Sequence, residues 1–166
     1  MRGACYSLVL LACLLTGKTF SQVNHGNIPS TIPTFNILLQ DGITYFNSGN
    51  LSSGKKLMIV YFDPDCDHCK TFAKALVPQI KAFNETQIVF ICSSNSLPLI
   101  KSFSSSTQLN KYPAVKIGTE GIYHATMNFY KVETTPFIAL YAKSGQLIKY
   151  FRNAPPVKEL ISLLHQ

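Results

Sequence analysis

The sequence predicts an α/β fold in which a mixed central sheet is flanked by helices on both faces. Apolar runs of strand length alternate with segments that carry apolar residues at helical spacing, and the chain closes with a β-hairpin and a helix. Residues 57–62 form a continuous apolar run, which is typical of a strand covered on both faces. Residues 66–83 follow with the spacing of an amphipathic helix.

The other elements follow from the same patterns. The Asp41-Gly42 pair between two short apolar runs predicts an N-terminal β-hairpin extension, and Pro78 predicts a kink within the first helix. The predicted strands are residues 35–40, 43–46, 57–62, 87–92, 114–117, 137–141 and 147–151, and the predicted helices are 66–83, 97–109, 122–130 and 157–165. We expect a core that contains the aromatic residues Phe62, Phe72, Phe83, Phe90, Phe137 and Tyr141.

The N-terminus has the features of a signal peptide. Arg2 precedes the apolar residues 6–15, and small or polar residues continue to Ser21. The apolar run is shorter than the roughly 20 residues that a membrane span needs. We therefore expect a signal peptide at 1–21, a leader at 22–34 and a domain at 35–166. The protein would be exported to the periplasm or cell envelope.

A lipid anchor at Cys13 is the alternative for this segment, because Leu10-Leu11-Ala12-Cys13 faintly resembles a lipoprotein box. Apolar residues continue beyond the cysteine, so we favour a soluble exported protein. The chain carries 15 Lys and Arg against 8 Asp and Glu, but the lysines are scattered. This distribution is typical of a solvated surface and argues against a nucleic-acid partner. We expect a monomer.

Two cysteines three residues apart open the predicted first helix. Residues at this spacing lie roughly 5–6 Å apart on a helix, which suits a disulfide. Cys66 falls at the helix N-terminus, where free N–H groups stabilise an anion, and Cys69 is placed one turn later to resolve a mixed disulfide. The site is interpreted as a redox site. Cys92 ends an apolar strand and is interpreted as a core residue.

A proline segment near the C-terminus completes a recognisable combination. Tyr130-Lys131-Val132 and Thr135-Pro136-Phe137 precede a late strand, and together with the cysteine pair they resemble the thioredoxin superfamily, in particular its TlpA-like exported members. The resemblance covers residue 35 to the C-terminus. It implies a thioredoxin fold, a cis Pro136 beside the cysteines, and a Thr135 backbone that pairs with the substrate chain. It also implies electron exchange with a partner protein and no organic cofactor.

The sequence departs from thioredoxins proper around the cysteines. Asp65 stands where they have tryptophan, Asp67-His68 replace Gly-Pro, and Val60 replaces the buried acid that many carry. The proton-transfer group for Cys69 therefore has no candidate in the sequence.

His68 is the residue that could set the direction of electron flow. A hydrogen bond or charge from His68 would stabilise the Cys66 thiolate and make the disulfide more oxidising. Asp63, Asp65 and Asp67 crowd the same turn and act in the opposite sense. Reductase and oxidase therefore both stay open.

These residues favour a thiol–disulfide oxidoreductase. Its substrates would be proteins with disulfides or thiols, and a redox partner would donate or accept electrons. Two alternatives remain: a copper-binding chaperone that uses Cys66, His68 and Cys69, and a thioredoxin-fold binding module without redox activity. Glu120 and His124 are four residues apart, as on one face of a possible helix, and are interpreted as a surface pair.

Overall fold

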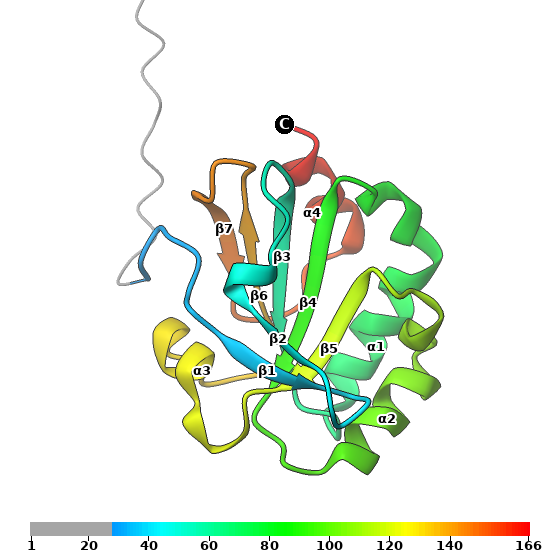
Figure 1. Ribbon diagram of the computed structural model, residues 1–166. Helices are drawn as coiled ribbons and strands as arrows, with labels where there is room; N and C mark the ends of the chain where they lie inside the picture. The colour runs from blue at the N-terminus through cyan, green and yellow to red at the C-terminus, as the bar shows by residue number, and fades with distance from the viewer. Residues whose placement is uncertain (1–27) are drawn as a thin grey trace, which may run out of the picture.

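The computed structural model describes residues 28–166, and its centre is a seven-stranded mixed sheet with helices on both faces (Figure 1). The predicted signal peptide at 1–21 and residues 22–27 of the predicted leader lie outside the described residues. Within residues 28–166, no helix has the length and apolar character that a membrane crossing requires.

The strand order across the sheet is β2-β1-β5-β4-β3-β6-β7. The strands β3, β4 and β5 run parallel, whereas the β1–β2, β1–β5, β3–β6 and β6–β7 pairs are antiparallel. The strands are β1 (Asn36–Leu39), β2 (Tyr45–Asn47), β3 (Lys56–Tyr61), β4 (Thr86–Cys92), β5 (Val115–Thr119), β6 (Phe137–Tyr141) and β7 (Leu147–Phe151). The α-helices are α1 (Asp67–Leu76), α2 (Leu97–Ser106), α3 (Ala125–Tyr130) and α4 (Val157–Leu164), and the 3-10 helices are η1 (Ser48–Asn50), η2 (Val77–Phe83), η3 (Leu109–Lys111) and η4 (Gly121–Tyr123).

The central strand β3 is buried on both faces, which explains its continuous apolar sequence. Met58 and Val60 pack in the cluster that α1, α2 and α4 cover, whereas Leu57 and Ile59 pack in the opposite cluster beside α3. The six aromatic residues expected in the core are all buried. The α/β class with helices on both faces, predicted from the alternation of segments, is confirmed.

Two of the predicted helices are interrupted. The helix predicted at 66–83 changes from α to 3-10 geometry at η2, whose second residue is Pro78, because proline lacks the N–H that an α-helix needs. The helix predicted at 122–130 divides at His124, whose φ of 47° is left-handed. The strand predicted at 114–117 extends instead from Val115 to Thr119.

The segment that enters the domain lies against the sheet. Ile28 is buried, and the carbonyl of Ser30 accepts a hydrogen bond from the Leu147 N–H at 2.8 Å. The strand β1 then approaches β5 so closely that a Cβ on Gly118 would stand 2.5 Å from the carbonyl oxygen of Leu38. The absence of a side chain at this position permits the β1–β5 pairing.

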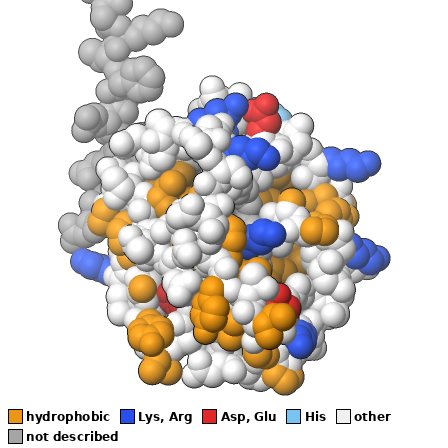
Figure 2. Space-filling model, viewed as in Figure 1, with side chains coloured by type: hydrophobic (Ala, Val, Ile, Leu, Met, Phe, Trp, Pro, Cys, Tyr) orange, Lys and Arg blue, Asp and Glu red, His pale blue; other side chains and the backbone are white. Residues whose placement is uncertain are grey.

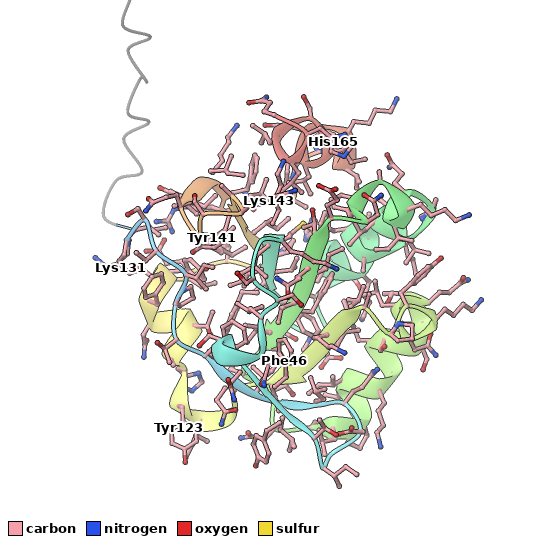
Figure 3. The ribbon with its side chains drawn as sticks, turned by 45° about the horizontal axis from the view of Figure 1, so that its top comes forward. Phe46, Tyr123, Lys131, Tyr141, Lys143 and His165 are labelled. Atoms are coloured by element: carbon pink, nitrogen blue, oxygen red, sulfur yellow. The ribbon has the colours of Figure 1, made fainter. Side chains whose placement is uncertain are left out.

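Hydrophobic side chains gather at the end of the molecule where the β1–β2 hairpin and α3 lie (Figure 2). Ile43, Tyr45, Ile122 and Tyr123 are 63% to 82% exposed there, and Tyr123 points away from the body of the molecule (Figure 3). The carboxyl ends of β3, β4 and β5 point to this same end (Figure 1).

The interpretation of Glu120 and His124 as a surface pair is wrong, because Glu120 is only 4% exposed. Its carboxylate accepts hydrogen bonds from the Tyr61 hydroxyl at 2.9 Å and from the N–H groups of Thr126 at 2.7 Å and Met127 at 3.2 Å. The turn at His124 brings the N-terminus of α3 back over the end of β5. Glu120 thereby joins β3, β5 and α3.

We expect Glu120→Ala to destabilise the fold. The variant leaves three donors without their acceptor in a buried place, so the free energy of unfolding should fall by about 3 kcal/mol. Urea denaturation measures this change. The matched control is Glu133→Ala, which removes an 81% exposed carboxylate and should change stability by less than about 0.5 kcal/mol. Equal losses in the two variants would contradict the account of Glu120.

Candidate active site

The turn after β3 places Cys66 at the N-terminus of α1. The Asp63 carboxylate accepts a hydrogen bond from the Asp65 N–H at 2.9 Å, and the Asp63 carbonyl accepts one from the Cys66 N–H at 3.1 Å. Cys66 is the N-cap of α1, with extended backbone angles, and its Sγ accepts the N–H of Cys69 at 3.3 Å. The thiol thus takes the position that a capping serine would occupy.

Cys66 is partly exposed and is the more acidic thiol of the pair. Its Sγ also lies 3.5 Å from the carbonyl oxygen of Thr135, to which it donates a hydrogen bond. Burial on its own would raise the pKa of Cys66, but hydrogen bonds from the Cys69 thiol and N–H outweigh it and lower that pKa below its ordinary value. The backbone N–H of His68 acts in the same direction.

Cys69 and Cys92 differ from Cys66 in being buried. Burial raises the pKa of Cys69 to about 12, and its hydrogen bond to Cys66 adds to the rise. Burial likewise raises the pKa of Cys92 to about 12, and the side chain is fully enclosed in the core. The interpretation of Cys92 as a core residue is confirmed. Cys66, Cys69 and Cys92, the cysteines among residues 28–166, are all free thiols in the structure.

The Thr135–Pro136 peptide is cis, as the resemblance implies. A groove of about 550 Å³ runs beside it, between the start of α1 and the segment that joins β7 to α4. Its apolar lining includes Phe72, Pro136 and Val157, and His68 and Thr135 border it. The structure therefore brings together the five residues selected from the sequence: Cys66, His68, Cys69, Thr135 and Pro136.

The charges around the cysteines are partly paired. Asp67 lies 3.6 Å from the ammonium group of Lys70, which also donates to the carbonyl of Asp65 at 3.1 Å. The side chain of His68 is exposed. Among residues 28–166, no group of three or more His, Cys, Asp or Glu is arranged to hold a metal ion.

A polar cavity of about 390 Å³, missed by the sequence analysis, lies on the other side of Thr135. Tyr61, Asp63 and Ser93 line it, and the Tyr61 hydroxyl leads to Glu120. Tyr61, near the end of an otherwise apolar run, could have indicated a polar partner in this place, because a buried hydroxyl needs a hydrogen-bond partner. Val60, which stands where many thioredoxins carry an acid, is fully buried among apolar side chains. The cavity is roomy and polar enough to bring water beside this turn.

Comparisons with solved structures find similar folds. A secreted Mycobacterium tuberculosis disulfide oxidoreductase, described as homologous to Escherichia coli DsbE, is 21% identical with a TM-score of 0.67, over 79% of this chain and 94% of that chain. The thioredoxin domain of a Bacteroides vulgatus thiol-disulfide oxidoreductase is 13% identical with a TM-score of 0.68, over 81% and 95%. Bacillus subtilis StoA is 16% identical with a TM-score of 0.60, over 81% and 98%.

A comparison with curated proteins gives no match. The model of the thioredoxin-like domain family matches residues 50–166, which is more than half of the chain. These residues include the cysteine pair, the cis-proline and the strands β3 to β7. The protein belongs to the thioredoxin-like family.

Proposed function

We propose that the protein is an exported thiol–disulfide oxidoreductase that acts on protein disulfides or thiols through Cys66 and Cys69. The observation that carries this proposal is the difference between the two thiols. The partly exposed thiol, Cys66, caps a helix and has a lowered pKa, and the buried thiol, Cys69, has a raised pKa. This asymmetry suits a nucleophile and a resolving thiol.

In the reducing direction, the Cys66 thiolate attacks one sulfur of a substrate disulfide. The substrate S–S bond breaks, a mixed disulfide with Cys66 forms, and the departing sulfur leaves as a thiolate that takes up a proton. The helix N-terminus and the Cys69 N–H stabilise the thiolate before the attack.

In the second step, Cys69 loses its proton and attacks the Sγ of Cys66. The mixed disulfide breaks, the Cys66–Cys69 disulfide forms, and the second substrate sulfur leaves as a thiolate. Burial is the main reason for the high pKa of Cys69, but the hydrogen bond and the negative charge of Cys66 contribute. Both contributions end when Cys66 enters the mixed disulfide, so this first step itself favours deprotonation of Cys69.

The substrate chain would lie in the groove beside Pro136. Thr135 offers its backbone next to Cys66, and the apolar lining of the groove suits side chains near the substrate cysteine. The exposed hydrophobic side chains at the same end of the molecule extend the surface that a protein substrate could contact.

The reverse reaction uses the same atoms, with the Cys66–Cys69 disulfide accepting two electrons from a substrate dithiol. His68 would bias the balance through its backbone N–H and, when protonated, through the charge of its ring. A redox partner in the cell envelope would supply or remove the electrons by thiol–disulfide exchange, without an organic cofactor.

The roles of the cysteines can be tested with three variants in an assay of insulin disulfide reduction driven by dithiothreitol. Cys66→Ser should abolish the enzyme-dependent rate. Cys69→Ser, reduced beforehand and mixed with insulin after the dithiothreitol is removed, should accumulate a mixed disulfide with the substrate, visible by non-reducing electrophoresis. Cys92→Ala is the control and should keep the rate within about twofold, since this thiol is buried in the core. Full activity in Cys66→Ser would refute the assignment of the nucleophile.

The pH dependence of alkylation tests the acidity of Cys66. The rate of its reaction with iodoacetamide should rise with pH and level off above the pKa of Cys66, with a midpoint below the value of about 8.5 for a free cysteine. Cys69→Ala should move the midpoint upward, because it removes a hydrogen bond to the thiolate. A midpoint at or above that of a free cysteine would contradict the account.

A further inference from the structure

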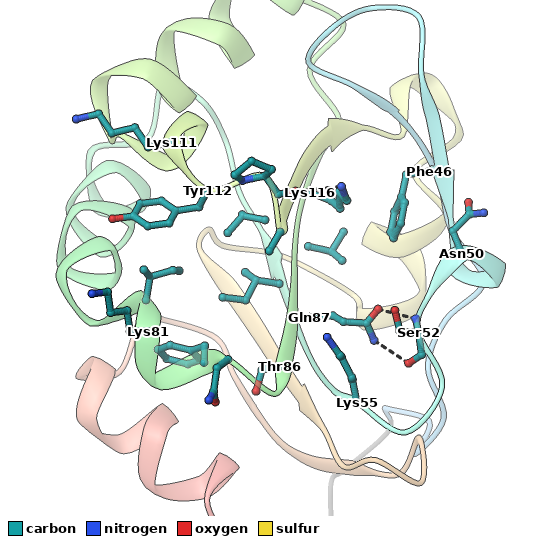
Figure 4. A pocket seen from close by; sticks show the side chains of 18 residues that line it. Phe46, Asn50, Ser52, Lys55, Lys81, Thr86, Gln87, Lys111, Tyr112 and Lys116 are labelled. Carbon is teal, nitrogen blue, oxygen red and sulfur yellow. Dashed lines mark hydrogen bonds between the residues drawn. The ribbon is translucent and has the colours of Figure 1, made fainter.

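Another cavity, of about 510 Å³, is drawn in Figure 4. It lies beside the first residues of β4 and β5, whereas the cysteine pair follows the carboxyl end of β3. It exists because β1 pairs with β5 only at Leu38 and Leu39, opposite the last two residues of β5. The chain then turns away through β2 and η1 and leaves the start of β5 without a neighbouring strand on that side.

The cavity has an apolar floor between two walls. Its floor is the edge of β4 where β5 begins, and residues from both faces of the sheet line it: Ile88 and Val115 on the face covered by α1 and α2, and Val89 on the opposite face. The segment with Phe46 forms one wall, and η2 and η3 form the other. Two hydrogen bonds hold the wall that contains Phe46 against β4. The side-chain amide oxygen of Gln87 accepts from the Ser52 N–H at 2.6 Å, and the amide NH₂ of Gln87 donates to the Ser52 carbonyl at 3.1 Å.

Four lysines line this cavity, and no Asp or Glu does. They are Lys55, Lys81, Lys111 and Lys116. Within residues 28–166, none of the four forms an ion pair. The acid next to the lining residues in sequence, Glu85, is engaged elsewhere, because its carboxylate pairs with Lys143 at 2.8 Å.

The lysines stand on both walls. Lys55 and Lys116 lie on the side of Phe46, whereas Lys81 and Lys111 lie on the helical side (Figure 4). The ammonium group of Lys116 is 6.0 Å from the centre of the Phe46 ring and donates to the carbonyl of Pro113 at 3.0 Å. Because the four lysines line one cavity and none is paired with a carboxylate, their positive potentials add up there.

We propose that this cavity binds a small organic anion with an apolar body. The apolar floor would take the body of the ligand, and the lysines would hold its negative group at the mouth. An ammonium group acts as a point charge, so the site should select for negative charge more than for one particular anionic group. The site is separate from the cysteine pair, and its occupation does not depend on the redox function proposed above.

The probe for the test is 8-anilinonaphthalene-1-sulfonate, an aromatic anion whose fluorescence rises in apolar surroundings. We expect saturable binding of one probe per chain, weakened by added NaCl. The neutral analogue N-phenyl-1-naphthylamine has the same aromatic body without the sulfonate, and it should bind at least about tenfold more weakly. Equal affinity for the two probes would overturn the proposal, because it would show that charge plays no part.

A double variant tests the lysines. Lys55→Gln with Lys116→Gln should weaken binding of the anionic probe about tenfold, since each exposed charge contributes up to about fivefold. Binding of the neutral analogue should stay within about twofold. The matched control, Lys74→Gln with Lys158→Gln, removes two exposed lysines on α1 and α4 and should leave both affinities unchanged. Equal weakening in the two double variants would mean that only net charge matters, which would also overturn the proposal.

A tryptophan reporter locates the bound probe, because the chain contains no tryptophan. Ala114→Trp places an indole at the mouth of the cavity, and Tyr123→Trp places one at the exposed rim of another apolar groove, at the far end of the molecule. Bound 8-anilinonaphthalene-1-sulfonate should quench the indole fluorescence of the Ala114→Trp variant much more than that of the Tyr123→Trp variant. If the new indole fills the mouth of the cavity, the Ala114→Trp variant should instead bind the probe more weakly. Probe that binds the Ala114→Trp variant with unchanged affinity and quenches only the indole of the Tyr123→Trp variant would place the site elsewhere.

Discussion

The N-terminus of α1 is the constraint on which the chemistry of this protein depends. A helix begins with N–H groups that have no partner within the helix, and here the sulfur of Cys66 satisfies one of them. The position holds because Phe72, Ala73 and Leu76 anchor α1 in the core beneath the sheet, while Asp63 shapes the turn that precedes it. The low pKa of one thiol and the high pKa of the other follow from this arrangement.

The parallel core of the sheet gives its two ends different characters. At the carboxyl end of β3 the chain continues into the turn that carries the cysteine pair. At the carboxyl end of β5 it reaches the buried carboxylate of Glu120. At their amino ends, the divergence of β1 from β5 leaves a cavity with lysines at its mouth. A ligand there and a substrate at Cys66 would occupy opposite ends of the same strands, which separates the two proposed sites physically.

The sequence predicted the fold and the cysteine pair because these depend on local patterns, whereas Thr135 and Pro136 were expected beside Cys66 from the resemblance to the thioredoxin superfamily. The apolar run of β3 and the spacing along α1 each involve only neighbouring residues. The burial of Glu120 was missed because it depends on His124, whose left-handed backbone returns α3 over the carboxylate. The lysine cavity was missed because Lys55, Lys81 and Lys111 are far apart in the chain. Only the folded structure brings these residues to the same cavity.

The reduction potential of the Cys66–Cys69 pair tests the central claim most directly. The purified protein is equilibrated with glutathione at defined ratios of reduced to oxidised form, and its free thiols are counted after alkylation. The account predicts a reversible two-electron transition to an intramolecular disulfide, at a potential between about −270 mV and about −120 mV. If no reversible disulfide forms between these two cysteines, the protein is not a thiol–disulfide oxidoreductase of the kind proposed.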